Sequence, residues 1–416
     1  MIPVLQALFG ILVFVALAMP FSSNWRRINW KLVGFAIALQ FIICVLLLKV
    51  PGISDGLNYV NRAVGALGDA TRKGTSFVFG YLGGGATPFE ASNPKLLATF
   101  AFQVLPLVIV MSALSALLWY WRILPLVIKA ISIVFERALG TRGPAGLVAT
   151  ANIFMGQIEA PLLVRPYLAR MTRYELLLVM TAGMATIAGS VMVIYSAMLG
   201  EQIQGVLGQL ITKSIMSVPA AILFAHVMLP ENNESSQALE KPPRVYEGAM
   251  DAITRGTSDG LNIWLNIIAI LIVAIALVAL LNGIISFITV GGAPLTMERM
   301  AGWVFSPIAW LMGVPWSEAT EVGTLLGIKT VLNEFIAYLR LQDLPPNTLS
   351  EHSKLIALYA VCGFANLSSV GIQISGIGAM APERRPDLIA LGFRALVAAT
   401  LASCMCGAVV GIVTLF

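Results

Sequence analysis

The polar residues Asn152, Gln157 and Glu159 stand inside one of the most apolar stretches of the chain. Pro161 follows them, and proline lacks a backbone N–H and tends to end a helix just before it. The short apolar segments on either side suit a helical hairpin that enters a lipid bilayer and returns. Broken backbone and a carboxylate at membrane depth are tolerated only where protein or a watery cavity surrounds them. The segment therefore predicts a functional site.

Other apolar segments are interrupted by residues of the same kinds. Amides, hydroxyls and carboxylates can hydrogen-bond a neutral polar solute, such as a sugar diol or the amide edge of a base. Backbone carbonyls freed beside the oxygens of Asn152 and Thr186 would suit a sodium ion, a hard cation that prefers oxygen ligands. These interruptions contain no histidine that could pair with a Ser or Cys, so the sequence predicts no catalytic residues. The further interruptions contain Thr186, Ser190, Glu318, Glu334, Asn366, Ser368 and Ser369.

Structural roles are an alternative for some of these residues. Thr186 and Ser190 could simply allow close helix packing or bond to their own helices. Asn152 and Gln157 could cap the ends of the hairpin. A glutamate in an apolar run is harder to explain in this way, because a charge at the bilayer centre costs at least about 2.5 kcal/mol.

The composition places the whole chain in a membrane. Hydrophobic residues make up 58% of the 416 residues and charged residues only 11%, against roughly 25% charged in a soluble domain. The net charge of +5 does not indicate nucleic-acid binding, because the basic residues stand in short loops between apolar runs, as the positive-inside rule predicts. The four cysteines and two histidines are too scattered for a metal centre.

The apolar runs predict an all-α integral membrane protein with eight transmembrane helices, two re-entrant helical hairpins and interfacial amphipathic helices. The hairpins are expected at about 144–170 and 298–340, the second broken at Gly313–Glu318. Amphipathic surface helices are expected at 55–69 and 123–140, and an exposed loop from Pro230 to Arg244. The eight transmembrane helices are expected at about 3–21, 32–50, 96–118, 175–199, 203–229, 261–289, 353–378 and 394–416.

The basic loops also predict an inverted repeat. Placing them in the cytoplasm puts both termini outside and makes the two hairpins enter from opposite sides. Each hairpin has a Met-Gly before its turn and a Glu-Ala near it, and a span broken by small polar residues follows each. Such paired interruptions in oppositely oriented halves indicate the midplane site of a transporter.

On this layout the chain divides into five parts. We expect N-terminal spans with an interfacial helix, a third span with an amphipathic helix, a first repeat, a polar loop with a scaffold span, and a second repeat. Their residues are 1–95, 96–142, 143–229, 230–292 and 293–416, respectively.

Four motifs carry a resemblance to a known family. They are Asn152–Pro161, Gly313–Ala319, Asn333-Glu-Phe335 with Tyr338, and Cys362–Ser369. Their order and separations match, and the likeness covers essentially the whole chain. The chain resembles the concentrative nucleoside transporters, which are sodium-coupled nucleoside symporters.

The resemblance implies particular site residues. The base would meet the first hairpin at Gly156, Gln157 and Ile158, with Glu159 nearby, and pack near Val191 and Phe364. The ribose would meet Glu334, Asn366 and Ser369. Sodium would be held by Asn152, the backbone of Met155, Thr186 and the backbone of Ile187. Many members carry Thr or Ser where this chain has Ile158, so its preference between purines and pyrimidines stays open.

The resemblance also implies a homotrimer in the inner (plasma) membrane of a bacterial cell, with sodium as coupling ion, moving nucleosides inward by an elevator-like movement. A proton-coupled nucleoside carrier is the main alternative. Two further alternatives are a membrane enzyme, with Glu159 and Glu334 as acid and base, and a channel.

Overall fold

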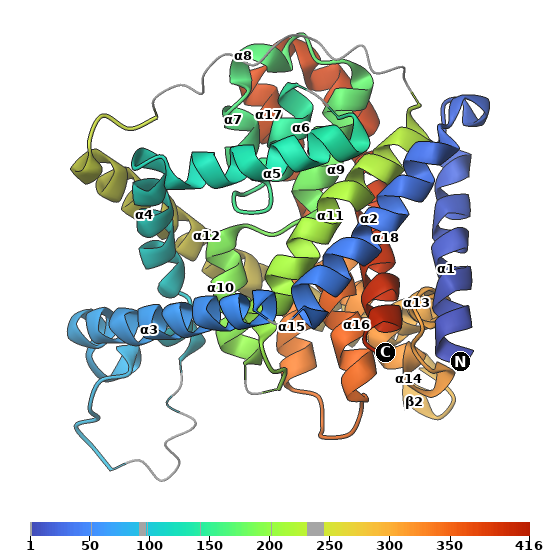
Figure 1. The fold of residues 1–416 in the computed structure, drawn as a ribbon. Coiled ribbons are helices and arrows are strands. Elements are labelled where there is room, and N and C mark those ends of the chain that lie inside the picture. Colours follow the sequence, from blue (N-terminus) through green and yellow to red (C-terminus); the bar gives the residue numbers. More distant parts are fainter. Residues whose placement is uncertain are drawn as a thin grey trace.

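The computed structural model is helical almost throughout (Figure 1). It describes residues 2–50, 52–90, 97, 99–141, 143–200, 202–230 and 245–416. The first half contains α1 (Ile2–Ala18), α2 (Trp30–Lys49), α3 (Ile53–Phe79), α4 (Leu107–Tyr120), α5 (Ile123–Leu139), α6 (Pro144–Ala151), α7 (Glu159–Leu162), α8 (Arg165–Leu168), α9 (Arg173–Ala185) and α10 (Gly189–Leu199). The second half contains α11 (Val206–Met228), α12 (Ala249–Ile285), α13 (Met297–Leu311), α14 (Trp316–Val331), α15 (Glu334–Gln342), α16 (Glu351–Val361), α17 (Leu367–Met380) and α18 (Arg385–Val413).

Short elements join some of these helices. They are the 3-10 turns η1 (Met19–Phe21), η2 (Trp25–Arg27), η3 (Gly80–Gly83) and η6 (Pro382–Arg384), the π-helical turn η5 (Phe100–Val104), and the antiparallel strands β1 (Thr289–Val290) and β2 (Ala293–Pro294).

Seven helical segments among the described residues are long and apolar enough to cross a membrane, so the predicted helical membrane fold is confirmed. The expected span at 353–378 consists of two short helices, α16 and α17. The last expected span begins earlier than predicted, because α18 starts at Arg385. The loop expected after Pro230 lies outside the described residues.

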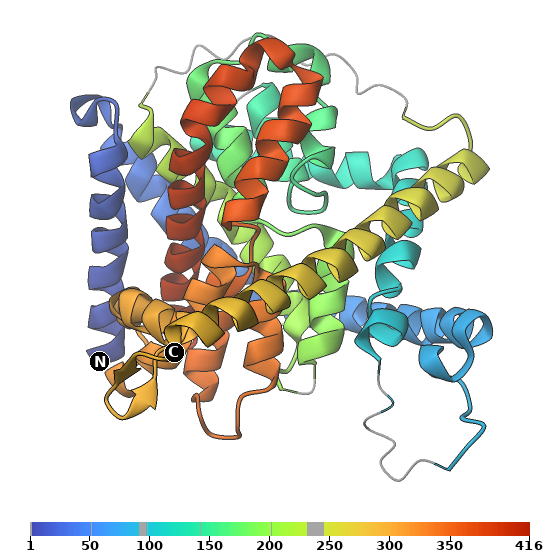
Figure 2. The same ribbon diagram turned by 180° about the vertical axis from the view of Figure 1, so that it is seen from behind.

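Different helices and loops lie at the two ends of the molecule. The α1–α2 loop, α8 and the α17–α18 turn lie at one end, and the two termini lie at the other (Figures 1 and 2). Helices α3 and α5 run across the direction of α1 at these opposite ends, where interfacial helices were expected. The α1–α2 loop, α8 and the α17–α18 turn, which were expected in the cytoplasm for their basic residues, thus lie at the same end, whereas α3 with Arg62, Arg72 and Lys73 lies at the other.

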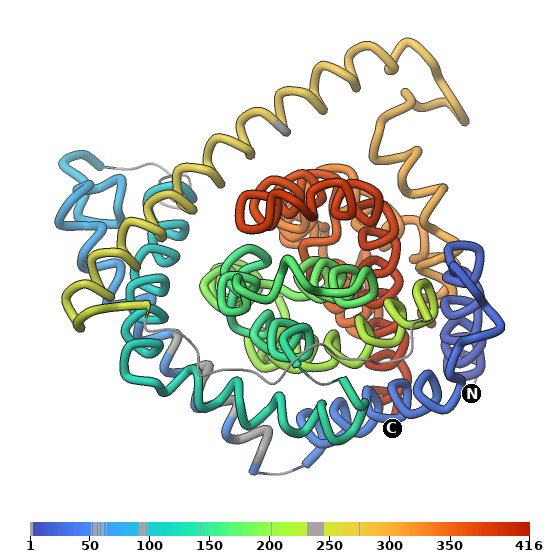
Figure 3. Tube along the Cα trace, turned by 90° about the horizontal axis from the view of Figure 1, so that it is seen from above, coloured from blue at the N-terminus to red at the C-terminus, as the bar shows by residue number. Residues whose placement is uncertain are grey.

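An outer layer curves around a central group of helices (Figure 3). We call α4, α5 and α12 the outer frame, and α6–α11 with α14–α18 the inner bundle. Within the frame, α12 approaches α4 closely at two glycines: a Cβ added to Gly256 or Gly260 would lie 2.8 Å from Ala113 Cα or 2.6 Å from Ile109 Cα, respectively. Small residues allow helices to pack this closely. Close packing matters in a membrane because the lipid supplies no hydrophobic driving force for helix association. In the inner bundle, α9, α11 and the C-terminal part of α18 are almost entirely buried.

The first hairpin has the predicted form. Helix α6 leads inward, residues 152–158 form a non-helical tip, and α7 and α8 return to the same end. The helix is interrupted just ahead of Pro161, as expected, but Pro161 itself lies in the first turn of α7 and does not end a helix.

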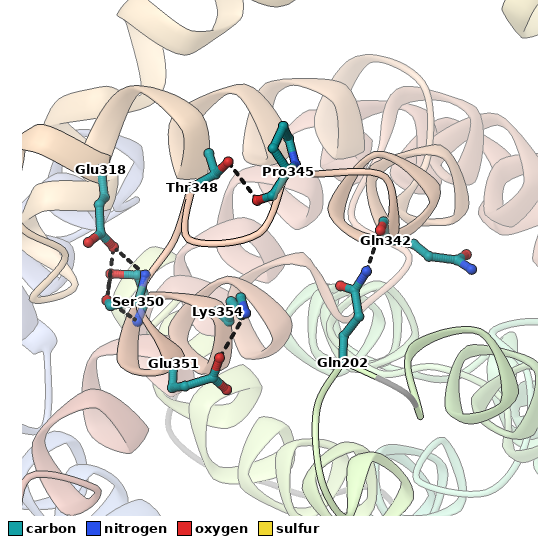
Figure 4. Close-up of polar contacts among 9 residues, drawn as sticks. Gln202, Glu318, Gln342, Pro345, Thr348, Ser350, Glu351 and Lys354 are labelled. Carbon is teal, nitrogen blue, oxygen red and sulfur yellow. Dashed lines mark hydrogen bonds and ion pairs between the residues drawn. The ribbon is translucent and has the colours of Figure 1, made fainter.

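The location of the second break was predicted wrongly. The turn at Gly313–Glu318 joins α13 to α14 at the end where the termini lie, and Glu318 accepts hydrogen bonds there from the backbone N and the hydroxyl of Ser350, at 3.1 and 2.9 Å (Figure 4). The hairpin that reaches the interior is α14–α15. Its tip is Leu332–Asn333, where Leu332 leaves the helical region and the Asn333 side chain caps α15 by accepting from Ile336 N at 2.9 Å.

Both broken spans are present. Helices α9 and α10 are separated by Thr186–Ala188, and α16 and α17 by residues 362–366. The extended conformation of Thr186 ends α9, that of Cys362 ends α16, and the extended Asn366 caps the start of α17. The two hairpin tips and the two breaks therefore contribute non-helical backbone inside the inner bundle.

Candidate functional site

A pocket of about 280 Å³ lies where the hairpin tips and the helix breaks meet. Its wall comes from the first hairpin, α10, the second hairpin, the α16–α17 break and the middle of α12. The nine residues expected to contact substrate all line it: Gly156, Gln157, Ile158, Glu159, Val191, Glu334, Phe364, Asn366 and Ser369. Residues more than 200 positions apart in the sequence thus meet in one cavity.

Glu334 anchors the polar side of the pocket. Its side chain is 5% exposed, and it accepts a hydrogen bond from the Tyr195 hydroxyl at 2.7 Å and from Asn366 Nδ2 at 3.1 Å. These donors use one lone pair on each carboxylate oxygen. A carboxylate has about four acceptor positions, so it can accept two further hydrogen bonds from a solute.

Asn366 links Glu334 to the start of α17. Its Oδ1 accepts from Ser369 N at 2.8 Å as the helix cap and from Ser368 Oγ at 2.7 Å, so both ends of its amide are engaged. The fixed orientation of the amide leaves the Nδ2 group directed at Glu334.

Gln157 contributes an amide from the opposite wall. Its Nε2 donates to Ser369 Oγ at 3.2 Å, which joins the first hairpin to α17. Its Oε1 is buried and has no partner among the described residues. A buried acceptor without a donor costs about 1–3 kcal/mol, so this oxygen favours a ligand that donates an N–H or O–H to it.

Two further contacts shape the tip of the first hairpin: an apolar contact with α17 and a hydrogen bond within the tip itself. Ile158 packs against α17 so closely that a Cβ added to Gly376 would lie 2.3 Å from Ile158 Cδ1. Glu159 Oε2 accepts from Gly156 N at 3.0 Å and so closes its own tip. One oxygen of Glu159 is thereby occupied in shaping the hairpin.

Backbone hydrogen bonds hold the tip and both breaks together. Gly189 N donates to Phe154 O at 3.0 Å, and Phe364 N donates to Thr186 O at 3.2 Å. The first bond joins the first hairpin to the α9–α10 break, and the second joins the two breaks. The first hairpin tip and the two breaks are therefore one hydrogen-bonded unit.

The residues expected to hold sodium also lie in this unit. Asn152 is fully buried, and its Oδ1 has no partner, although its Nδ2 donates to Val148 O at 3.0 Å. The backbone oxygens of Met155 and Ile187 accept no hydrogen bond from the residues that the structure describes. These three oxygens without a donor among the described residues, together with the Thr186 hydroxyl, are of the ligand type that a hard cation such as sodium prefers.

The sequence did not assign several other residues to the pocket. They include the aromatic residues Tyr195 and Phe335 and the α12 residues Ile263 and Ile267. Tyr195 follows Val191 by four positions on one helix face, a spacing that could have indicated it. Its ring packs on Phe335 at 5.9 Å and on Tyr338 at 4.7 Å between centroids.

A second cavity, of about 410 Å³, separates the first hairpin from the outer frame. It is lined by Leu162 and Leu163 of the hairpin segment and by residues of α4 and α12, among them Trp119 and Asp259. Glu159 and Ser190 border both cavities, so the second one adjoins the pocket.

Comparison with known proteins identifies the family. Residues 9–82 match the model described as Na+ dependent nucleoside transporter N-terminus, and residues 209–411 match its C-terminus. Residues 101–202, which include the first hairpin, match a model described as nucleoside recognition. The chain belongs to the Na+ dependent nucleoside transporter family.

Individual similar proteins support this family assignment. This transporter is 39% identical to an uncharacterized transporter of Haemophilus influenzae (98% of this chain, 97% of the relative) and 34% identical to the nucleoside permease NupC of Helicobacter pylori (98% and 97%). It is similar to a solved structure of CNTnw in an inward-facing substrate-bound state, with a TM-score of 0.89, 37% identity, and 99% and 98% of the two chains covered. The resemblance of the motifs to concentrative nucleoside transporters is thus confirmed.

Proposed function

We propose that this nucleoside transporter imports nucleosides together with sodium ions. The observation that carries the proposal is the pocket of about 280 Å³, in which both hairpins and both broken helices present hydrogen-bonding groups. The proposed substrate site consists of the nine residues named above. The two free acceptor positions of Glu334 and the hydroxyl of Ser369 suit the adjacent hydroxyls of a ribose.

The base would lie on the side of the first hairpin. The unpartnered Gln157 Oε1 suits an N–H donor on the base edge, and Val191 and Phe364 supply apolar surface to its faces. Ile158 offers no hydroxyl there, so we propose that shape and the Gln157 amide determine base preference.

Sodium would bind beside this pocket rather than in it. The proposed ligands are Asn152 Oδ1, the Thr186 hydroxyl and the backbone oxygens of Met155 and Ile187. A cation there would tie the first hairpin to the α9–α10 break and so preorganise the wall that Gln157 belongs to. Prior ordering by sodium would raise nucleoside affinity, which is thermodynamic coupling.

We propose that transport proceeds by movement of the inner bundle against the outer frame, as in an elevator. The proposal rests on the division seen in Figure 3 and on the cavity of about 410 Å³ between the two parts. The part of the pocket wall that belongs to the inner bundle is joined by hydrogen bonds and would move as a body with its ligands, past the α12 residues of the frame. The parts 143–229 and 293–416 would supply the two repeats of the moving bundle.

The assembly we propose is a homotrimer in the bacterial inner membrane. The long helix α12 exposes large apolar side chains along its length, among them Leu265, Ile272 and Leu280 at 50%, 65% and 62%. Such a surface suits lipid tails or a neighbouring subunit.

Uptake by proteoliposomes tests the coupling directly. Radiolabelled uridine and adenosine are supplied with an inward sodium gradient, with choline in place of sodium, and with a proton gradient alone. We expect accumulation above the external concentration only with the sodium gradient. Accumulation driven by protons without sodium would establish the proton-coupled alternative, and equilibration without accumulation would indicate a channel.

A further inference from the structure

Lys213 is a fully buried cation in the middle of α11. Its Nζ donates to the backbone oxygen of Ala185 and lies 3.5 Å from Ser403 Oγ on α18. A lysine in the interior of an apolar protein is costly, because its ammonium group loses its hydration. Nothing in the proposed substrate and sodium sites requires it, since it lines neither cavity.

The position of the ammonium group connects the two helix breaks. Ala185 is the last residue of α9, and its oxygen is one of the carbonyls left free at a helix C-terminus. On the other side lies Gly363, in the α16–α17 break: a Cβ added there would be 3.1 Å from Lys213 Nζ and 2.9 Å from Ala185 O. Ser403, the weaker partner of Lys213, itself donates to Cys362 O at 3.4 Å.

These contacts direct the carbonyls around the proposed sodium site. At the α9–α10 break, the oxygen of Ala185 is held by Lys213 and that of Thr186 by Phe364 N. The oxygen of Ile187, the next along the chain, receives no donor among the described residues. Fixing the carbonyls of Ala185 and Thr186 restrains the backbone that leads into Ile187, and with it the direction of the Ile187 oxygen.

We propose that Lys213 is a positioning residue for the coupling ion. Its ammonium group acts as a tethered cation that holds the Ala185 carbonyl and keeps the Thr186–Ile187 segment in the geometry that sodium requires. The inference rests on the proposed sodium symport. It assigns Lys213 no contact with sodium or nucleoside.

The second buried lysine does not make the same contacts. Lys329 of α14 is also fully buried, but its Nζ has no hydrogen-bond partner among the described residues. It therefore fixes no carbonyl at either break. The positioning role falls to Lys213 alone of the two.

The test is sodium dependence of uptake by Lys213→Met, which keeps the length of the side chain and removes the charge. We expect the sodium concentration for half-maximal uridine uptake to rise about tenfold or more, the loss of one charged hydrogen bond. The uridine KM at saturating sodium should stay within about threefold of wild type. If Lys213 only stabilised the fold, its loss would not raise the half-saturating sodium concentration while leaving the uridine KM nearly unchanged.

Ser214→Ala is the matched control, because Ser214 is the next residue on the same helix, is fully buried, and has no partner for its hydroxyl in the described part of the chain. Its sodium dependence should equal that of wild type. Ser403→Ala keeps the lysine and removes only its weaker partner, so it should shift half-saturating sodium in the same direction by a smaller factor. This variant tests the proposal if Lys213→Met does not fold.

An unchanged or lower half-saturating sodium concentration in Lys213→Met would overturn the inference, as would an equal rise in the uridine KM. So would a wild-type value in Ser403→Ala if only that variant folds. The proposed function fails separately, if wild-type uptake does not respond to sodium at all.

Discussion

Glu334 is the residue on which the polar half of the pocket depends, because both of its oxygens already have protein donors. The tyrosine and asparagine donors hold the carboxylate in the wall of the cavity. A neutral amide in its place would keep one acceptor oxygen and replace the other by an NH₂ group, which accepts neither from Tyr195 nor from a ribose hydroxyl. The residue therefore sets both the geometry and the charge of the proposed ribose site.

For Glu334→Gln we expect uridine affinity to fall by roughly 100-fold, the loss of two hydrogen bonds to a charged acceptor. Calorimetric titration of detergent-purified protein with uridine at saturating sodium measures this. Wild-type affinity in this variant would contradict the ribose role.

Tyr195→Phe removes only the hydroxyl that donates to Glu334. We expect the uridine KM to rise about tenfold, since the carboxylate loses one donor and gains freedom to rotate. Tyr338→Phe is the matched control: its hydroxyl donates at 2.9 Å to Leu358 O, outside the pocket, so it should cost stability without a change in KM. Equal KM values for the two variants would show that the Tyr195 hydroxyl does not act through the pocket.

Asn152→Leu tests the sodium site with a side chain of similar size that has no oxygen. We expect the stabilisation of the protein by sodium to disappear, because ligand stabilisation depends on binding to the folded state. Thermal unfolding in sodium and in choline chloride measures it, with Thr150→Val on the same helix as control, since the Thr150 hydroxyl bonds only Gly146 O of its own helix. A sodium-dependent shift of wild-type size in Asn152→Leu would exclude this residue from the site.

At the scale of elements, the pocket exists because four helices are interrupted and the interruptions bond to one another. The bonds Gly189 N to Phe154 O and Phe364 N to Thr186 O replace hydrogen bonds that continuous helices would have made internally. In a bilayer each unreplaced bond would cost several kcal/mol, so the breaks are stable only together. A change at one break should therefore affect the others.

Gly363 tests this dependence, since its φ of +135° is rarely adopted by other residues and an added Cβ would crowd Ala185 O. For Gly363→Ala we expect a loss of about 1–3 kcal/mol of stability and a strong reduction in uptake. Gly371→Ala on α17 is the control, because nothing lies within 4 Å of the added Cβ; it should be neutral or slightly stabilising. Thermal unfolding and uptake measure the two effects. Equal stability and equal uptake in the two variants would contradict the prediction.

At the scale of the whole molecule, the question is whether the inner bundle moves against the outer frame. Leu162 on the hairpin and Ser258 on α12 line the same cavity between these two parts. The four native cysteines, Cys44, Cys362, Cys404 and Cys406, are all buried, so cysteines introduced at the cavity can be labelled selectively.

For the double variant Leu162→Cys and Ser258→Cys, we expect a short thiol cross-linker to abolish uptake while uridine binding persists. The physical reason is that the cross-link fixes the separation of frame and bundle without entering the substrate pocket. The single variants treated in the same way should transport normally, and a cleavable linker should restore uptake on reduction. Undiminished transport by the cross-linked protein would rule out the elevator-like movement.

The sequence by itself determined the class of protein and most of the lining of the pocket. Hydropathy and the cost of polar groups in lipid are local properties, so an apolar run interrupted by Gln157, Glu334 or Asn366 is recognisable without knowledge of its neighbours. The family motifs then indicated the residues that share a cavity. For the same reason, the breaks predicted at 185–190 and 364–369 overlap those that the structure has at 186–188 and 362–366.

Only the tertiary structure decided which turn serves as the second hairpin tip. The segments Gly313–Glu318 and Leu332–Asn333 both interrupt apolar helices with polar residues, and periodicity alone does not distinguish a turn at the membrane surface from one at its centre. The same holds for Tyr195 and Lys213, which lie inside α10 and α11 and at no helix break. Their roles depend on what faces them across the inner bundle, and that is fixed by packing between segments distant in sequence.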